Sequence, residues 1–308
     1  MDALVLSGGG VKGAYQAGAI QVVFESGYRP GIVTGISVGA LNAAFLAAHQ
    51  ESDQAGARLA EFWEAEVTEP SRFVKKRSLL DIVWRVLTKR WDGVVDTKPL
   101  AEVVGRVLAP HFPRQGGIQV RVGAVDLRSG ALVYTSPESG DFINAVLAST
   151  AEPISMPLRK IRDVPHYDGG LRDVAPLKQA IGLGATRIVC VLTQPVEGGP
   201  FVGQEGDVLD LIQRVLGIVT NEIVENDLEA AQRINRLLLE LPPEVLAHPY
   251  FATKRPIPLT VIRPSVAIPV SLDSFTREDI RRMLEQGRQD ARAIMLPVNA
   301  SSPKSRSR

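Results

Sequence analysis

The chain opens with an alternation of short apolar strands and helices. Ala3–Leu6 and Ile32–Thr34 have the composition of buried strands, and each is followed by a glycine-containing turn and a helical stretch, Ala14–Ser26 and Ala40–His49. Two strands joined through a helix pair in parallel, and the helices then cover the sheet. The opening therefore predicts an α/β protein whose central sheet is mostly parallel.

The turn after the second strand has the sequence Gly35-Ile36-Ser37-Val38-Gly39. A Gly-x-Ser-x-Gly pattern between a strand and a helix is typical of a nucleophile elbow, where a sharp turn exposes the serine hydroxyl. Gly35 and Gly39 lack the Cβ atoms that would obstruct a close approach of strand and helix. The helix start also places a positive dipole end where an oxyanion would develop. We therefore predict that Ser37 is a nucleophile rather than a solvated turn residue.

The turn after the first strand contains Gly8, Gly9, Gly10 and Gly13. Their Gly-x-Gly-x-x-Gly spacing matches the dinucleotide-binding fingerprint, which also requires an acidic residue about 20 positions further on, at the end of the second strand. That strand leads instead into Ser37. The other interpretation is an oxyanion hole, because successive N–H groups without side chains can point at one negative oxygen. Both interpretations place the loop beside Ser37.

A third glycine motif, Asp168-Gly169-Gly170, follows a short strand. Functional groups gather at the carboxyl ends of parallel strands, so we expect Asp168 to lie near Ser37. A serine with a base and backbone donors is the arrangement that acyl transfer requires. His166 lies two residues before Asp168, on the same face of a strand, and is the alternative base of a triad.

The rest of the chain predicts further elements around the same sheet. A hairpin is expected at 119–126 and 131–135, and other strands are expected at 158–161, 164–167, 187–193 and 259–263. Helices are expected at 51–69, 96–108, 141–149, 208–241 and 277–295, the last of them capped by Thr276. Because neither a repeat nor a clear linker is visible, we predict one domain over 1–298, with its motifs within 3–195, a helical and strand decoration over 196–298, and a disordered basic tail at 299–308.

The composition is that of a globular protein: 45% of the residues are hydrophobic and the net charge is +1. Proteins that bind nucleic acids usually carry a strong excess of basic residues. This chain has no such excess, so no nucleic acid is expected as a partner. Cys190 is the single cysteine, which fits a reducing compartment. The residue spacing contains no metal-ligand pattern, and no metal or cofactor is expected. The first residues, Met1 to Ala3, lack the basic region of a signal peptide, and no run of about 18 apolar residues occurs, so we expect a cytoplasmic protein.

Residues 71–92 differ from the rest in charge. Before the closing Asp92, the segment contains one acidic residue, Asp81. It contains seven basic residues: Arg72, Lys75, Lys76, Arg77, Arg85, Lys89 and Arg90. Apolar residues recur among them at helical spacing, including two tryptophans: Leu80, Val83, Trp84, Leu87 and Trp91. A basic amphipathic helix of this kind suits an anionic lipid surface. Peripheral membrane association through 72–91 is therefore one interpretation, and an ordinary solvated face over the core is the other.

The order of the three motifs resembles the patatin-like phospholipase family. The glycine loop with Lys12, the Ser37 elbow and the Asp168 motif occur in the family's order, and the Ala148–Pro157 loop and Pro176 also match. The resemblance covers roughly residues 3–195. It implies a three-layer α/β/α fold and a catalytic dyad without a cofactor.

Carried over by position, the resemblance assigns roles to individual residues. Ser37 would be the nucleophile, Asp168 the general base, and Gly8, Gly9 and Gly10 would line the oxyanion hole. Gly13, Gly35, Gly39, Gly169 and Gly170 complete the motifs, and Lys12 falls where the family has Lys or Arg. Val174 and Ala175 stand where the family often has an Asn, which puts one supporting hydrogen bond in question.

The resemblance thus implies a serine acyl hydrolase acting on a phospholipid, a lysophospholipid or another long-chain ester. The reaction would pass through an acyl-enzyme on Ser37, and acyl transfer to another acceptor would use the same residues. Two other classes stay open. One is a dinucleotide-binding oxidoreductase built on residues 8–13, and the other is a catalytically silent, membrane-associated regulator. The presence of both Ser37 and Asp168 favours the enzyme.

Overall fold

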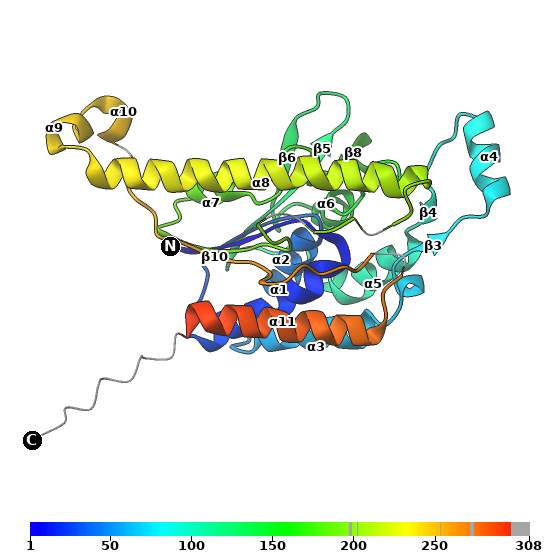
Figure 1. The fold of residues 1–308 in the computed structure, drawn as a ribbon, viewed down its shortest axis with the longest axis horizontal. Helices are drawn as coiled ribbons and strands as arrows, with labels where there is room; N and C mark the ends of the chain where they lie inside the picture. Colours follow the sequence, from blue (N-terminus) through cyan, green and yellow to red (C-terminus); the bar gives the residue numbers. More distant parts are fainter. Residues whose placement is uncertain (197–198, 202, 253, 272–273, 297–308) are drawn as a thin grey trace, which may run out of the picture.

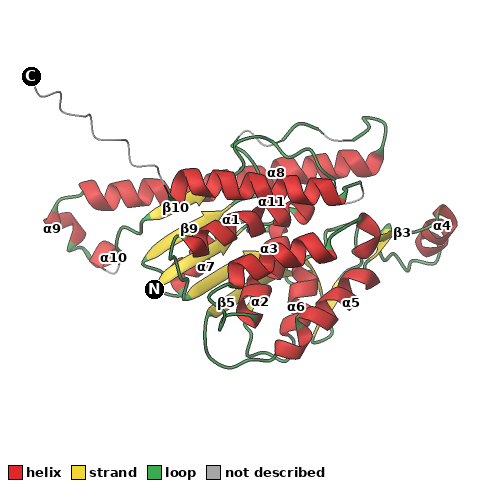
Figure 2. Cartoon of the chain, turned by 90° about the horizontal axis from the view of Figure 1, so that it is seen from below, coloured by secondary structure: helices red, strands yellow, loops and turns green. Residues whose placement is uncertain are grey.

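The protein folds into three layers, a central sheet between two sets of helices (Figures 1 and 2). The computed structural model describes residues 1–196, 199–201, 203–252, 254–271 and 274–296. The long helix α8 runs across one face of the sheet with α7, and α1, α3 and α11 cover the opposite face. The tail predicted at 299–308 lies outside the described residues.

The main sheet has eight strands in the hydrogen-bonding order β10-β9-β1-β2-β5-β8-β7, and β6 also pairs with β5. The strands are β1 (Asp2–Leu6), β2 (Ile32–Ile36), β5 (Gln119–Asp126), β6 (Leu132–Thr135), β7 (Arg159–Ile161), β8 (Val164–Asp168), β9 (Arg187–Val191) and β10 (Leu259–Ile262). A separate small sheet pairs β3 (Lys75–Lys76) with β4 (Val95–Asp96). The five strands from β10 to β5 are parallel, and β6, β7 and β8 are antiparallel. The predicted α/β class with a mostly parallel sheet is confirmed.

Eleven α-helices lie within the described part of the chain. They are α1 (Gly13–Glu25), α2 (Val38–Ala48), α3 (Ala55–Glu66), α4 (Leu79–Leu87), α5 (Lys98–Val107), α6 (Phe142–Ser149), α7 (Leu177–Gly182), α8 (Val208–Glu240), α9 (Pro243–Leu246), α10 (Pro249–Ala252) and α11 (Arg277–Met295). Thr276 caps α11 as predicted, in a capping box with Asp279. This cap satisfies backbone N–H groups that the first turn of a helix leaves without partners.

The core lies on both faces of the sheet, and the alternation of side chains along β1 shows it. Leu4 and Leu6 belong to the larger cluster, under α1, α2 and α11, whereas Ala3 and Val5 belong to the smaller one, under α7 and α8. All four are fully buried. Burying a leucine side chain contributes about 1.5–3 kcal/mol. The smaller cluster includes Cys190, so the cysteine is a buried strand residue.

The pairing of β5 determines where the functional residues meet. Val122 pairs with Gly35 of β2 on one side and with β6 on the other. Two residues later, Ala124 pairs with Asp168 of β8 and again with β6. Since a strand residue has one partner on each side, β2 and β8 lie along the same edge of β5. Asp168 therefore lies in space just beyond the end of β2, which is where Ser37 leads into α2.

Candidate active site

Ser37 has the strained backbone of a nucleophile elbow. Its φ of 56° and ψ of −127° place it in a region that non-glycine residues rarely adopt, between β2 and α2. A Cβ atom at Gly35 would lie 2.3 Å from the Gly39 carbonyl oxygen, and one at Gly39 would lie 2.3 Å from the Leu6 oxygen. Both glycines are therefore needed for the turn. The Ser37 N–H donates to the Ser149 hydroxyl at 2.8 Å, which fixes the elbow against α6.

The glycine loop after β1 closes against the elbow. A Cβ atom at Gly8 would lie 3.2 Å from the Ser37 Cβ, and one at Gly9, whose φ is 150°, would lie 2.1 Å from the Thr193 hydroxyl oxygen. Gly10 also has a positive φ, of 57°. The loop therefore faces Ser37 at van der Waals distance. This favours the oxyanion interpretation over the dinucleotide interpretation.

The hydrogen bonds of the loop distinguish its three glycines. The Gly8 N–H donates to the Val174 carbonyl at 3.1 Å, and the Thr193 hydroxyl donates to the Gly8 carbonyl at 2.5 Å. Within the described residues, the N–H groups of Gly9 and Gly10 have no acceptor. These two N–H groups are thus the ones available to an incoming oxygen. Gly13, at the end of the loop, packs so tightly that a Cβ would lie 2.2 Å from Val38.

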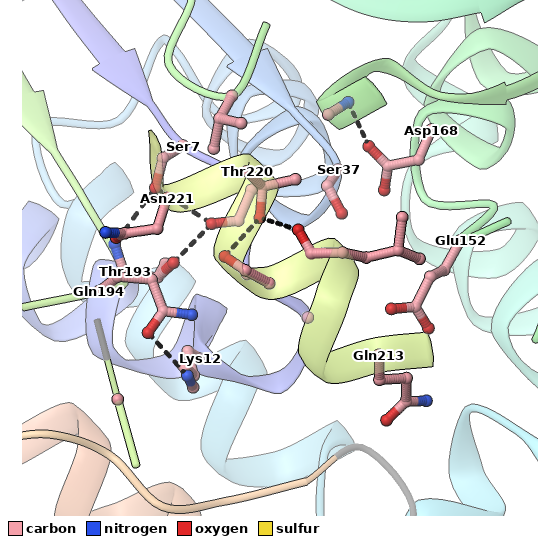
Figure 3. Close-up of a pocket in the computed structure, with 18 of the residues that line it drawn as sticks. Ser7, Lys12, Ser37, Glu152, Asp168, Thr193, Gln194, Gln213, Thr220 and Asn221 are labelled. Atoms are coloured by element: carbon pink, nitrogen blue, oxygen red, sulfur yellow. Dashed lines mark hydrogen bonds between the residues drawn. The ribbon is translucent and has the colours of Figure 1, made fainter. Parts of the chain in front are cut away.

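Asp168 ends β8 beside Ser37, and both side chains point into the same space (Figure 3). Burial raises the pKa of the Asp168 carboxyl to about 7, although hydrogen bonds from the Gly170 N–H and the Ser37 hydroxyl act in the opposite direction. The Gly170 bond is 2.7 Å long. A Cβ at Gly169 would lie 2.6 Å from the Gly123 oxygen, so this glycine allows the chain to pass close to β5.

The four histidines do not form part of this arrangement. His166 is buried and its Nδ1 lies 2.8 Å from the carbonyl oxygen of Val164 in its own strand. His49 and His111 contact each other, with ring centroids 5.3 Å apart, and His248 begins the short turn into α10. No histidine is among the described residues that line the cavity at Ser37.

A cavity of about 330 Å³ opens in front of Ser37 and Asp168. Helix α8 forms its outer wall, and Gln213, Thr220 and Asn221 line the cavity from this helix (Figure 3). The side-chain amide oxygen of Asn221, Oδ1, is buried without a hydrogen-bond partner among the described residues. The cavity is therefore polar on the side of α8.

Lys12 contributes the basic group on this polar side. Its ammonium donates to the Gln194 side-chain oxygen at 3.0 Å. Burial lowers the pKa of Lys12 to about 8. The site therefore holds a cation whose charge is poorly solvated, and an anionic or strongly polar group would stabilise it.

An apolar recess of about 60 Å³ adjoins Ser37 on the other side. Its lining is almost entirely hydrophobic: Val11, Val38, Leu41, Trp63, Val67, Phe73, Val74, Leu100, Met156 and Phe275. Ser37 lines both spaces. The Ser37 hydroxyl thus lies at the boundary between a polar and an apolar compartment.

A family comparison agrees with this geometry. Residues 4–181 match the family model described as patatin-like phospholipase. The chain belongs to the patatin-like phospholipase family. The match contains the glycine loop, the elbow and the Asp168 motif, and it leaves α8 and α11 outside.

Several bacterial proteins are similar to this chain over part of its length. The chain is 25% identical to the uncharacterized protein YjjU of Escherichia coli over 63% of its length, and 28% identical to the uncharacterized protein YqhO of Bacillus subtilis over 60%. It is 26% identical over 67% of its length to an uncharacterized NTE family protein of Mycobacterium bovis, Mb1092c. The alignments cover 52%, 61% and 52% of those relatives, so the chain spans about half of their length or slightly more. The solved structure of VipD from Legionella pneumophila is similar with a TM-score of 0.49 and 14% identity, covering 96% of this chain and 66% of VipD.

The residues before Pro176 depart from the pattern of patatin-like proteins, and the structure shows what the main chain does there. Val174 and Ala175 stand where an Asn was expected. The Val174 carbonyl accepts the Gly8 N–H, so the main chain here supports the glycine loop. Thr34, inside β2, donates to the Pro176 carbonyl at 3.1 Å and ties the following turn to the elbow strand.

Sequence reasoning missed two features of the site. The first is Glu152, a half-buried residue of the cavity wall. Desolvation raises the pKa of its carboxyl, and the carboxylate accepts a 2.6 Å bond from Ser155. Its charge also raises the pKa of Asp168. The only signal was its place in the Ala148–Pro157 loop.

The second missed feature is a buried polar chain behind the two turns. Gln16 donates to the Ser7 and Val191 carbonyls at 2.8 and 3.0 Å, Asn42 donates to Gln16 at 3.1 Å, and Trp63 donates to Asn42 at 2.8 Å. These side chains connect α1, α2 and α3 beneath the glycine loop. Each lies in a helix whose pattern shows only that it is buried.

The described residues contain no group of three or more His, Cys, Asp or Glu side chains placed to hold a metal ion. None of their helices combines the length and apolar character needed to cross a bilayer.

Proposed function

We propose that this protein hydrolyses long-chain acyl esters of lipids, with Ser37 as the nucleophile and Asp168 as the general base. The observation that carries the proposal is the buried Asp168 carboxyl beside the elbow serine, with its pKa raised to about 7. A general base works best when its pKa lies near the operating pH. A carboxylate with an ordinary pKa near 4 would be a much poorer base for a serine hydroxyl.

The proposed reaction has two steps that share the same groups. Asp168 takes the proton of the Ser37 hydroxyl while the oxygen attacks the ester carbonyl carbon. The N–H groups of Gly9 and Gly10 stabilise the resulting oxyanion, together with the N–H of Val38 at the start of α2. The carbon–oxygen bond to the alcohol then breaks, and Asp168 returns its proton to that alcohol. Water, deprotonated by Asp168, then attacks the acyl carbon. The bond from that carbon to the Ser37 oxygen breaks, Asp168 returns the proton to Ser37, and the fatty acid leaves.

The two compartments at Ser37 support one orientation of the substrate. The apolar recess suits the part of the acyl chain next to the ester, because its walls are almost entirely hydrophobic and burying each CH₂ gains about 0.8 kcal/mol. The polar side, with Lys12 and Asn221, suits the alcohol part. A phospholipid or lysophospholipid has this division between an apolar and a polar half. Acyl transfer to another alcohol is the second candidate, because it requires only that a different acceptor replace the water.

A fluorophosphonate probe tests the nucleophile directly, since it labels only activated serines. We expect the wild type to be labelled and to hydrolyse a p-nitrophenyl ester, and Ser37→Ala to show neither. Ser129→Ala, in the exposed β5–β6 turn, serves as the matched control and should behave as wild type. Asp168→Asn should reduce turnover by at least about 100-fold while the protein stays folded.

Two results would contradict the proposal. The first is labelling of Ser37→Ala at the wild-type level. The second is a His166→Ala variant that is folded and as inactive as Asp168→Asn, which would transfer the role of base to the histidine. Product analysis with added glycerol separates hydrolysis from acyl transfer.

A further inference from the structure

Helix α4 extends away from the body of the protein (Figures 1 and 2). None of its nine residues is buried. Its apolar side chains are unusually open to solvent, with Leu80 83% and Leu87 77% exposed, and Trp84 is half exposed. An isolated helix of this length is marginal in water, so its amphipathic character needs a surface to pack against.

The polar edge of α4 is held by ion pairs to the segments that carry it. Asp81 and Arg85 lie one turn apart on this edge. Arg77 is 3.3 Å from Asp81 and 3.1 Å from Asp92, and Arg85 is 3.0 Å from Asp81 and 3.3 Å from Asp92. At 100° per residue, the apolar side chains occupy the remaining arc of the helix. The pairs therefore turn the polar edge toward the protein and leave the apolar face outward.

The same ion pairs correct the charge pattern that the sequence indicated. Arg77 and Arg85 were expected to belong to a basic face, but both are neutralised by acidic partners. Exposed positive charge remains on either side of the helix, at Lys75, Lys89 and Arg90. Arg90 also lies over the Trp84 ring, 5.8 Å from its centre. An apolar face flanked by exposed cations and tryptophans is complementary to an anionic lipid bilayer.

The segments that carry α4 form part of the wall beside Ser37. Phe73 and Val74, before the helix, line the apolar recess, as does Met156. After the helix, the Val94 and Val95 N–H groups both donate to the Ser155 carbonyl, at 2.9 and 3.1 Å. The helix is thus directly connected to the walls of the recess.

From these observations we infer that α4 is a lipid-docking helix, which inserts its apolar face into an anionic bilayer beside the entrance to the recess. Docking itself is independent of the proposed function. The consequence for catalysis rests on that function: a lipid's acyl chain would pass from the bilayer along Phe73 and Met156 to Ser37. Contact with a second copy of the protein would cover the apolar face of α4, but it would not by itself account for the exposed cations on either side of it.

Co-sedimentation of the full chain with vesicles tests the docking. We expect binding to phosphatidylcholine vesicles that contain phosphatidylserine, and weaker binding without it. The double variant Leu80→Ser with Leu87→Ser should bind at least about tenfold more weakly. Leu239→Ser is the matched control, because Leu239 on α8 is 73% exposed and lies outside the docking surface, and it should bind as wild type. Each of Lys75→Gln, Lys89→Gln and Arg90→Gln should weaken binding about fivefold.

Hydrolysis separates docking from catalysis. The double leucine variant should keep wild-type turnover of p-nitrophenyl butyrate, which also shows that it is folded, and should lose at least about tenfold of its activity on vesicle phospholipid. Equal sedimentation of the double variant and the wild type would overturn the proposal. A second result would also overturn it: a wild-type protein that does not sediment with the vesicles and that is a dimer in gel filtration, while the double variant is a monomer. Absence of ester hydrolysis by the wild type would instead contradict the proposed function, and sedimentation alone would still decide the docking.

Discussion

Asp168 is the residue whose protonation should control the reaction. Only its ionised form can accept the Ser37 proton, and burial raises its pKa to about 7. We therefore expect kcat/KM for a soluble ester to increase with pH up to about 7 and to level off above it. Desolvation also raises the pKa of the neighbouring Glu152 carboxyl. The two carboxyls interact, so the pH profile reports on Asp168 and Glu152 together. Initial rates of p-nitrophenyl butyrate hydrolysis across this range would check it. A flat profile down to pH 5 would show that Asp168 is not the base.

The same shift predicts that Asp168 reduces stability. Its folded pKa, about 7, lies above the value of about 4 that a solvated aspartate has, so the folded state binds more protons than the unfolded state between these values. The contribution of this group to the free energy of unfolding therefore falls as pH rises from about 4 to 7. Asp168→Asn, which cannot ionise, should have a higher Tm than wild type at pH 8. That difference should shrink as the pH approaches 4. A lower Tm for Asp168→Asn at pH 8 would contradict this reasoning.

At the scale of elements, sequence predicted the parts with local signals. Thr276 marks the start of α11, and Gly35 and Gly39 mark the elbow, because caps and turns need particular residue types. Asp168 lies beside Ser37 for a different reason from the one expected. It was expected at the carboxyl end of a parallel strand, whereas β8 is antiparallel and meets β2 along β5. This arrangement depends on long-range pairing.

Contacts between distant segments explain what sequence could not predict. Nothing in the local pattern of α8 indicates that its Asn221 lines the same cavity as a glycine loop more than 200 residues earlier in the chain. A periodic apolar pattern predicts a helix, but it does not say which neighbour that helix covers.

Helix α8 forms the polar wall of the cavity, so we expect a change at Asn221 to affect binding of the alcohol part of the substrate. The Asn221 Oδ1 atom is buried without a partner in the described part of the chain, and leaving such a group unpaired carries a penalty of about 1–3 kcal/mol. Asn221→Leu should therefore keep or raise the Tm. If Asn221 binds the alcohol part, the KM for a lysophospholipid should rise about tenfold and that for p-nitrophenyl butyrate should not change. Asn226→Leu, at an exposed position on the same helix, is the control. Equal KM changes for both esters would mean that Asn221 has no role in recognising the alcohol.

At the scale of the whole molecule, the C-terminal helix is packed into the family region. A Cβ at Gly18 in α1 would lie 2.0 Å from the Leu284 carbonyl oxygen, and a Cβ at Gly287 in α11 would lie 2.0 Å from the Tyr15 oxygen. The two helices thus cross with glycines against each other's backbone. Since α11 lies outside the family match, this crossing attaches the last third of the chain to the helix that follows the glycine loop.

This crossing predicts that residues 1–298 unfold as one domain. Gly287→Ala should lower the Tm, because the added methyl group must push α1 and α11 apart, and overpacking of this kind typically reduces stability by about 1–3 kcal/mol. Gly105→Ala is the matched control: no atom lies within 4 Å of its Cβ position in α5, so it should gain up to about 1 kcal/mol of helix propensity. The two changes are chemically identical and should have opposite signs. Urea unfolding followed by tryptophan fluorescence and by loss of ester hydrolysis should give a single coincident transition that shifts to lower urea in Gly287→Ala. If hydrolysis persists after an earlier transition that Gly287→Ala alone displaces, α11 belongs to a separate unit and the single-domain prediction is wrong.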